Sequence, residues 1–235
     1  MNRFDFTLLR WATTYANVWP WFDGFVAFLV SWEIAKGGFV IALYWWAWFR
    51  LDKAQGKGAD KVQESQRARL LLALAGAMTG LTIAAVAALV LPYRPRPRIL
   101  VGLDPELSPG WAEWSAFPSD HATLFFALAL GLWYVHRRLG WVALLHAIVV
   151  VSLPRVYLGL HYPTDILGGA LIGWCVAWFA QRERRLLVLA QRLVHWGSVR
   201  PAWFYALGFV ASYSVATLFS DWRRAGNTLL AWLLR

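Results

Sequence analysis

One uninterrupted apolar stretch limits the possible folds of this chain more than any other feature. Residues 70–91 contain no charged side chain, and the stretch is followed directly by Pro92. A bilayer core about 30 Å thick requires roughly 20 residues of helix to cross it. Proline cannot continue a helix in its interior, so it supplies a natural end. The stretch therefore predicts a complete transmembrane helix.

The overall composition agrees with a membrane protein. The chain is 59% hydrophobic and 15% charged, whereas a soluble domain carries about 25% charged residues. The net charge of +10 comes from basic residues in short loops rather than from a solvated basic patch, so no nucleic-acid partner is predicted. Cys175 is the only cysteine; it excludes a disulfide framework and is expected to be a small core residue.

The predicted fold class is all-α, a polytopic transmembrane helix bundle with five core spans and a sixth candidate span near the C-terminus. The predicted core spans are 25–49, 70–91, 122–135, 141–154 and 166–180. The sixth candidate is 202–219, while 186–196 and the tail from 222 look amphipathic and are expected to lie along the membrane surface. Glu33 and Lys36 interrupt the first span one turn apart, so they are expected either to pair toward the interior or to mark a snorkelling end.

Flanking charge predicts the orientation. Basic residues gather in the loops 50–69, 137–138 and 182–185, which the positive-inside rule places in the cytoplasm. Residues 92–118 and 155–165 then lie together on the opposite side. No cleaved signal peptide is expected, because charged side chains interrupt the N-terminal apolar residues.

The first chemically suggestive segment, here called the arginine cluster, is Arg94-Pro95-Arg96-Pro97-Arg98. Its prolines restrict the backbone, and each guanidinium can bind phosphate oxygens in a forked geometry. Taken alone, the segment fits a stiff basic connector that touches lipid headgroups better than it fits a phosphate site.

The second segment, the capping cluster, is Phe117-Pro118-Ser119-Asp120-His121, directly before an apolar helix. Ser119 suits the N-cap position, where free N–H groups and the helix dipole favour an anion. His121 can exchange a proton with a leaving oxygen near neutral pH. An ordinary helix cap beside a structural histidine is the alternative.

The third segment, the histidine cluster, covers residues 155–165. Asp165 lies four residues after His161, so it can accept a hydrogen bond from one ring nitrogen and leave the other with a lone pair for attack. Arg155 adds a positive group for phosphate. One histidine and one carboxylate are too few ligands for a metal, so neither a metal nor another cofactor is predicted. His146 lies away from the clusters and is expected to be a packing residue.

The three clusters together resemble the type 2 phosphatidic acid phosphatase superfamily. Its signature consists of Lys-x6-Arg-Pro, Pro-Ser-Gly-His and Ser-Arg-x5-His-x3-Asp, and this chain matches it between Arg96 and Asp165. The resemblance implies His161 as nucleophile, His121 as general acid and Asp165 as the residue that orients His161. It also implies phosphate binding by Arg96, Ser119 and Arg155, to which the arginine cluster adds Arg94.

Three positions depart from the signature. Leu89 stands in place of the lysine, Asp120 replaces the glycine and Pro154 replaces the serine. Arg94 or Arg98 could supply the missing lysine charge. The Pro-Ser-Asp-His form resembles the branch that acts on undecaprenyl diphosphate. The implied layout is a membrane phosphatase domain over 1–200, with its signature region at 89–168, and an additional transmembrane or interfacial segment over 201–235.

The expected function is therefore hydrolysis of the terminal phosphate of a polyprenyl diphosphate through phosphohistidine. The expected partners are this lipid substrate and membrane lipid. The expected location is the inner cell membrane, in a multi-pass arrangement with the site on the extracytoplasmic side. Phosphatidate, phosphatidylglycerophosphate and a lipid A phosphate remain alternative substrates. A non-catalytic lipid-binding or transport protein remains an alternative of another class, and a vanadate haloperoxidase is disfavoured because those relatives are soluble.

Overall fold

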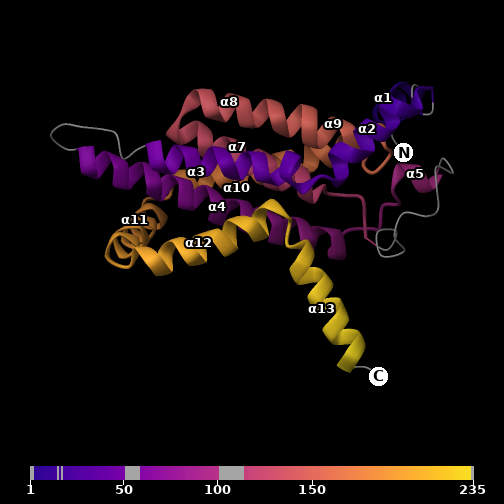
Figure 1. Cartoon of the computed structure of the whole chain (residues 1–235). Coiled ribbons are helices and arrows are strands. Elements are labelled where there is room, and N and C mark those ends of the chain that lie inside the picture. The colour runs from indigo at the N-terminus through magenta and orange to yellow at the C-terminus, as the bar shows by residue number, and fades with distance from the viewer. Residues whose placement is uncertain (1–2, 15, 17, 51–58, 101–113, 234–235) are drawn as a thin grey trace.

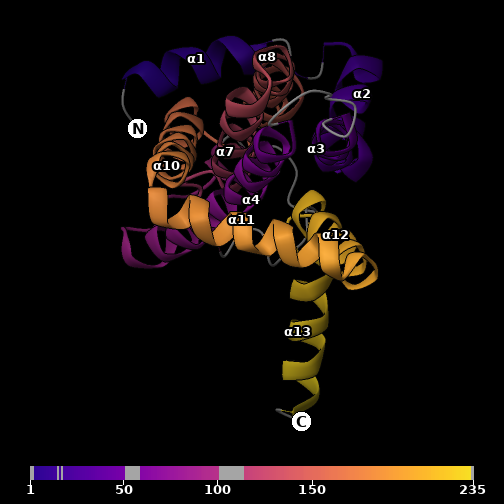
Figure 2. The ribbon, with the colours of Figure 1, turned by 90° about the vertical axis from the view of Figure 1, so that its left-hand side faces the viewer.

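The computed structural model describes residues 3–14, 16, 18–50, 59–100 and 114–233, and helices dominate the described parts. In chain order the elements are α1 (Arg3–Thr14), α2 (Pro20–Ser31), the π-helix η1 (Ile34–Gly38), α3 (Phe39–Arg50), α4 (Ala59–Val90), α5 (Pro97–Leu100), α7 (Asp120–Val135), α8 (Arg137–His146), the π-helix η3 (Ala147–Ser152), α9 (Leu153–Tyr157), α10 (Pro163–Arg182), α11 (Arg184–Val199), α12 (Pro201–Ala216) and α13 (Ser220–Leu233). Helices α3, α4, α7, α8 and α10 run side by side as a bundle (Figures 1 and 2). The predicted all-α class is confirmed.

Three predicted core spans correspond to helices that are long and apolar enough to cross a membrane. These are Asp60–Val90, Arg137–Tyr157 and Pro163–Arg182. The predicted span 25–49 is instead a broken pair, Pro20–Ser31 and Ile34–Arg50, bent by 66°. The prediction missed this break because composition alone does not reveal a π-turn. The structure thus contains three such helices among the described residues, or four if the bent pair is one span.

The other two predicted spans are shorter than the bilayer requires. Helix α7 is apolar but has 16 residues, and α12, the sixth candidate, also has 16 and is not among the helices long enough to cross. Helix α7 packs against α4, α8 and α10, so its neighbours, rather than lipid, cover most of it. This explains why its side chains are apolar on nearly every face.

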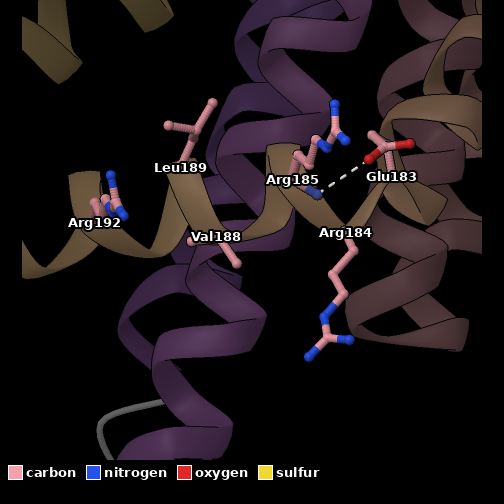
Figure 3. Close-up of a pocket in the computed structure, with 6 residues that line it drawn as sticks. All are labelled: Glu183, Arg184, Arg185, Val188, Leu189 and Arg192. Atoms are coloured by element: carbon pink, nitrogen blue, oxygen red, sulfur yellow. Dashed lines mark hydrogen bonds between the residues drawn. The ribbon is translucent and has the colours of Figure 1, made fainter.

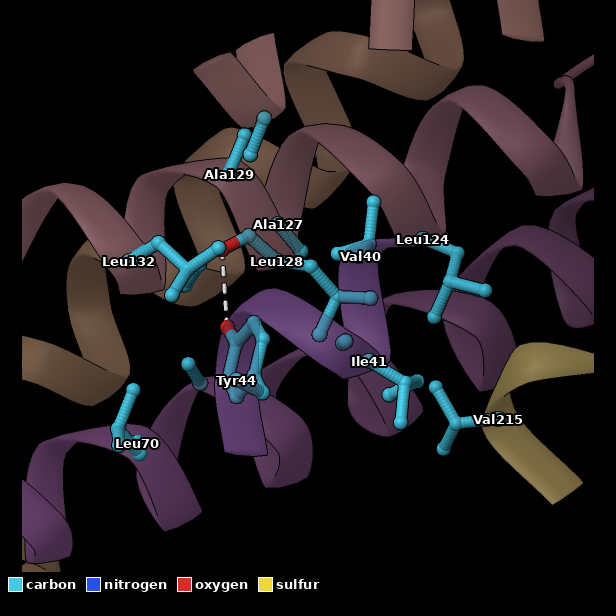
Figure 4. Close-up of a cluster of buried hydrophobic side chains, with 14 of the residues drawn as sticks. Val40, Ile41, Tyr44, Leu70, Leu124, Ala127, Leu128, Ala129, Leu132 and Val215 are labelled. Atoms are coloured by element: carbon cyan, nitrogen blue, oxygen red, sulfur yellow. Dashed lines mark hydrogen bonds between the residues drawn. The ribbon is translucent and has the colours of Figure 1, made fainter. Parts of the chain in front are cut away.

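The core lies around α7. Its fully buried Leu124, Phe125, Leu128 and Leu132 fill the space between the surrounding helices. Tyr44 of α3 donates a hydrogen bond from its hydroxyl to the Leu128 carbonyl at 2.9 Å (Figure 4). This bond satisfies a polar group that would otherwise be buried without a partner.

Small residues let α4, α7 and α10 approach closely, as is usual where helices associate in membranes. Gly76 of α4 faces Ala177 of α10, and Gly173 of α10 faces the Thr123 backbone of α7. A Cβ on Gly173 would lie 2.0 Å from the Thr123 carbonyl oxygen. At this crossing only glycine fits.

Gly173→Ala is therefore expected to destabilise the bundle by about 1–3 kcal/mol, the usual cost of overpacking. The measurement is the thermal melting midpoint in detergent. The matched control is Gly24→Ala on α2, where an added Cβ meets nothing within 4 Å. Equal melting of the two variants would contradict the close crossing.

Connections gather at two ends of the bundle. The turns α7–α8 and α10–α11, with the end of α3 and the start of α4, lie at the left-hand end in Figure 1. The end of α4, the start of α7 and the α9–α10 turn lie at the other end. The three basic loops therefore share one end, although Lys53 and Lys57 lie outside the described residues. The arginine, capping and histidine clusters share the opposite end.

The C-terminal helices lie outside this bundle. Helix α11, which contains the predicted amphipathic segment 186–196, crosses one end of it (Figure 2), and α13 projects away. Cys175 is exposed on α10. The prediction that it is a core residue is wrong, because α10 turns its glycines, not Cys175, toward α4 and α7.

Candidate active site

The structure brings the three clusters together through backbone hydrogen bonds. The Ala116 N–H, just before the capping cluster, donates to the Arg94 carbonyl at 2.8 Å. The Ser119 N–H donates to the Asp165 carbonyl at 3.1 Å. Main-chain bonds fix the relative position of segments that are distant in sequence, so side chains from all three can act on one ligand.

His161 is buried with its two ring nitrogens in different surroundings. Nδ1 lies 2.8 Å from the carbonyl oxygen of Ala116, which can only accept a hydrogen bond. Nδ1 therefore carries the proton, and in the neutral ring Nε2 keeps its lone pair. Nε2 lies 3.4 Å from Nη1 of Arg96, which also donates to the Leu160 carbonyl at 2.9 Å. The free lone pair thus faces a cation that can bind phosphate.

Asp165 does not make the hydrogen bond expected for it. Its Oδ2 lies 3.7 Å from His161 Nδ1 and accepts the Tyr162 N–H at 2.7 Å. The predicted bond from the ring to Asp165 is wrong, because the Ala116 carbonyl occupies the Nδ1 position. Asp165 instead caps the start of α10 and contributes a negative charge close to the ring.

Arg94 faces protein carboxylates. Its guanidinium donates to Asp165 and to Asp5 of α1, both fully buried, and to the Thr164 hydroxyl at 2.8 Å. It also lies over the Tyr162 ring, 4.1 Å from the centroid. A guanidinium held this way favours a positioning role over the expected contact with phosphate. Asp5 was not predicted from the sequence as a site residue. The sequence signal available for it was a carboxylate near the start of an N-terminal helix, which does not indicate a contact with Arg94.

His121 is paired with its neighbour. Its Nδ1 lies 2.7 Å from Oδ1 of Asp120, and the Asp120 side chain is 43% exposed while that of His121 is 10% exposed. The carboxylate accepts a hydrogen bond from Nδ1, while burial and the nearby Arg155 lower the pKa of His121 from its ordinary value to about 3. The negative charge of a bound phosphate would oppose this shift and favour the doubly protonated ring that a proton donor requires. Asp120, which replaces the signature glycine, therefore has a partner in the site.

Ser119 and Arg155 complete the candidate phosphate-binding donors. Ser119 is the N-cap of α7, and its fully buried Oγ accepts the Ala122 N–H at 3.4 Å. Its own O–H remains able to donate. Arg155 is 2% exposed and donates from Nη1 to the Val151 carbonyl at 2.6 Å.

The charges of the site act on one another. Arg155 interacts electrostatically with Asp120 and with Arg96. Burial lowers the pKa of Arg96 from its ordinary value, and the nearby carboxylates of Asp120 and Asp165 act in the opposite direction. Arginine nonetheless stays protonated in proteins. The half-buried guanidinium of Arg96 and the buried guanidinium of Arg155 therefore lie beside the two histidines.

Other polar features lie elsewhere. His146 packs on Phe39, and its Nε2 lies 2.7 Å from the Ala35 carbonyl. Among the described residues, no three His, Cys, Asp or Glu side chains gather as a metal site would require. A hollow of about 520 Å³ lies at the opposite end over α11, lined by Glu183, Arg184, Arg185, Val188, Leu189 and Arg192 (Figure 3), and it contains none of the cluster residues.

The family can now be assigned. The profile of the PAP2 superfamily matches residues 67–186, just over half of the chain, and this range holds all three clusters. The chain belongs to the PAP2 superfamily. With its apolar helices, it is a multi-pass membrane protein of that family.

Several curated proteins are similar to parts of the chain. A bacitracin transport permease protein, BcrC, of Bacillus licheniformis is 40% identical over 28% of this chain and 32% of its own length. A putative undecaprenyl-diphosphatase, YbjG, of Escherichia coli is 39% identical over 34% of this chain and 42% of its own. A lipid A 4'-phosphatase of Bacteroides thetaiotaomicron is 41% identical over 26% and 28%. Each similarity covers less than half of either protein, and no solved structure matches the chain.

Proposed function

We propose that this protein is a lipid phosphatase that removes the terminal phosphate from a membrane-embedded polyprenyl diphosphate. The observation that carries the proposal is the orientation of His161. Its Nδ1 is bonded to the Ala116 carbonyl at 2.8 Å, and its Nε2 faces the Arg96 guanidinium at 3.4 Å. A neutral imidazole with a fixed tautomer beside a phosphate-binding cation is suited to nucleophilic attack on phosphorus.

In the first step His161 Nε2 forms a bond to the terminal phosphorus while the bond from phosphorus to the bridging oxygen breaks. Arg96, Arg155 and Ser119 bind the three equatorial oxygens, where negative charge is spread in the transition state. His121 donates its Nε2 proton to the departing oxygen. The products are phosphohistidine and the lipid monophosphate.

In the second step water attacks the phosphohistidine. His121, now deprotonated at Nε2, accepts a proton from that water, the phosphorus–nitrogen bond breaks and inorganic phosphate leaves. Asp120 keeps the His121 ring oriented through both steps, because its carboxylate holds Nδ1. Asp165 orients the histidine cluster by capping α10 and pairing with Arg94.

The domain assignment and orientation belong to the same proposal. The phosphatase domain is residues 1–200, to which 201–235 add a further C-terminal segment. The arginine-rich turn between α10 and α11 and the basic turn before α8 lie at the opposite end of the bundle from the site. Since basic loops stay in the cytoplasm, the site faces the extracytoplasmic side of the inner membrane. The relatives' names favour undecaprenyl diphosphate, with a lipid A phosphate next.

The substrate proposal predicts phosphate release in detergent from undecaprenyl diphosphate in preference to phosphatidate, phosphatidylglycerophosphate and a lipid A phosphate. The rate is expected to be unchanged by EDTA, because arginine side chains supply the positive charge. Activity lost on chelation and restored by Mg²⁺ would contradict the mechanism. A protein that binds these lipids and hydrolyses none of them would instead be a binding or transport protein.

A further inference from the structure

A buried lysine lies on a helix outside the three clusters. Lys36 is 4% exposed and belongs to the π-turn η1, next to the break that bends the first helix pair by 66°. Its Nζ donates to Oε1 of Glu33 at 3.0 Å. The Glu33 side chain is 41% exposed and that of Lys36 is 6% exposed. The ammonium therefore points into the bundle, whereas a snorkelling lysine would point out of it.

The neighbours of Lys36 hold the π-turn in place. The carbonyl of Ala35, which directly precedes Lys36, lies 2.7 Å from Nε2 of His146. A Cβ on Gly37 would lie 1.9 Å from the Ala216 carbonyl oxygen, so α12 packs directly on the turn. π-turns inside helices occur frequently at functional sites. An ionisable side chain facing the interior of a membrane bundle commonly has a functional role.

The π-turn that contains Lys36 packs against η3, whose Val151 carbonyl accepts a hydrogen bond from Arg155 of the candidate site. The Lys36 ammonium interacts electrostatically with Asp120 and Arg155 and with His121. In the proposed mechanism Asp120 and His121 form the side of the site where the leaving oxygen receives its proton, and Arg155 binds the adjacent transferred phosphate. Lys36 is thus associated with the leaving group rather than with the attacking His161.

The candidate site lacks the positive charge that the signature lysine would supply. Leu89, at the position of the signature lysine, is 72% exposed on the outer face of α4, and Arg94 is bonded to Asp5 and Asp165. Among the described residues Glu33 is the hydrogen-bond partner of the Lys36 ammonium, which has three N–H donors. Two donors therefore remain for a ligand.

We propose that Lys36 is a specificity-determining residue that binds the retained phosphate of a diphosphate substrate. The inference rests on the proposed function, in which the leaving group of a polyprenyl diphosphate is the lipid monophosphate. Negative charge develops on that group as the bridging bond breaks, and a nearby ammonium stabilises it. A phosphomonoester such as phosphatidate has no second phosphate, so it gains little from Lys36.

The kinetic test compares Lys36→Met with wild type on undecaprenyl diphosphate and on phosphatidate. We expect kcat/KM to fall about tenfold or more for the diphosphate, the loss of one charged hydrogen bond, and to change little for phosphatidate. Lys61→Met, an exposed lysine on α4, is the matched control. An equal loss on both substrates would overturn the proposal.

A double variant separates substrate binding from a structural ion pair. In Lys36→Met the Glu33 carboxylate loses its partner, whereas Glu33→Gln/Lys36→Met leaves no unpaired charge. If Lys36 only neutralises Glu33, the double variant recovers diphosphate hydrolysis, and the proposal fails. If Lys36 binds the retained phosphate, the double variant remains as defective as Lys36→Met.

Binding of inorganic pyrophosphate tests Lys36 without turnover. Calorimetry in detergent compares His161→Ala with His161→Ala/Lys36→Met. We expect the second form to bind pyrophosphate about tenfold or more weakly, with phosphate binding little changed. Equal pyrophosphate binding by the two forms, including none by either, overturns the Lys36 proposal. A wild type that hydrolyses no lipid phosphate overturns the proposed function instead, while a pyrophosphate difference would still support the Lys36 site.

Discussion

His161→Ala is expected to lower turnover of the lipid substrate at least about a thousandfold, because it removes the nucleophile of a two-step reaction. No neighbouring side chain replaces it, since Arg96 is a cation and Asp165 is directed to Arg94 and the Tyr162 N–H. The measurement is phosphate release together with ³²P labelling of the protein during turnover. Wild type should carry acid-labile label, and His161→Ala should carry none.

Two further variants make this result specific. His195→Gln changes an exposed histidine of α11, outside the clusters and the Lys36 π-turn, and should retain turnover. His121→Ala should lose turnover of the lipid substrate but retain labelling by p-nitrophenyl phosphate, whose leaving group needs no proton from the enzyme. Its labelled form should accumulate, because water then lacks its general base. Label in His161→Ala, or equal labelling defects in both variants, would contradict the assigned roles.

The fold was predictable wherever helices meet lipid. Residues 70–91 are apolar and free of charge, and α4 covers all but the last of them. The bent first pair was not predictable, because hydropathy does not distinguish a straight helix from one broken at Trp32 and continued by the π-turn at Ile34–Gly38. The central position of α7 was also not predicted. A short apolar segment has the same composition whether lipid or other helices surround it, so hydropathy does not distinguish the two cases.

The site was predictable in its members and less so in their contacts. Sequence spacing places Asp165 four residues after His161, but it does not reveal that the backbone carbonyl of Ala116 accepts the hydrogen bond from the ring. Spacing also cannot reveal a partner 89 positions away, as Asp5 is from Arg94. Such contacts depend on how helices pack, and a local pattern contains no information about that packing.

The contact between Arg94 and two buried carboxylates makes Arg94→Met the variant with the largest expected effect on stability. Asp5 and Asp165 are both 0% exposed, and each would lose its guanidinium partner. Breaking a buried ion pair by removing one partner typically costs about 3–5 kcal/mol. We expect a markedly lower thermal melting midpoint in detergent. Because Asp5 is on α1, that helix should also become accessible to limited proteolysis before the rest of the bundle.

The same variant distinguishes positioning from phosphate binding at Arg94. If Arg94 positions Asp165, Asp5→Asn should partly restore the stability of Arg94→Met, because one unpaired carboxylate is then replaced by a neutral amide. Arg94→Lys should be intermediate, since an ammonium keeps the charge but cannot donate in a fork to both carboxylates. If Arg94 instead binds phosphate, these variants should melt like wild type and raise KM alone. A positioning role changes the melting midpoint, whereas phosphate binding changes KM. One series of melting measurements and one substrate titration therefore decide between them.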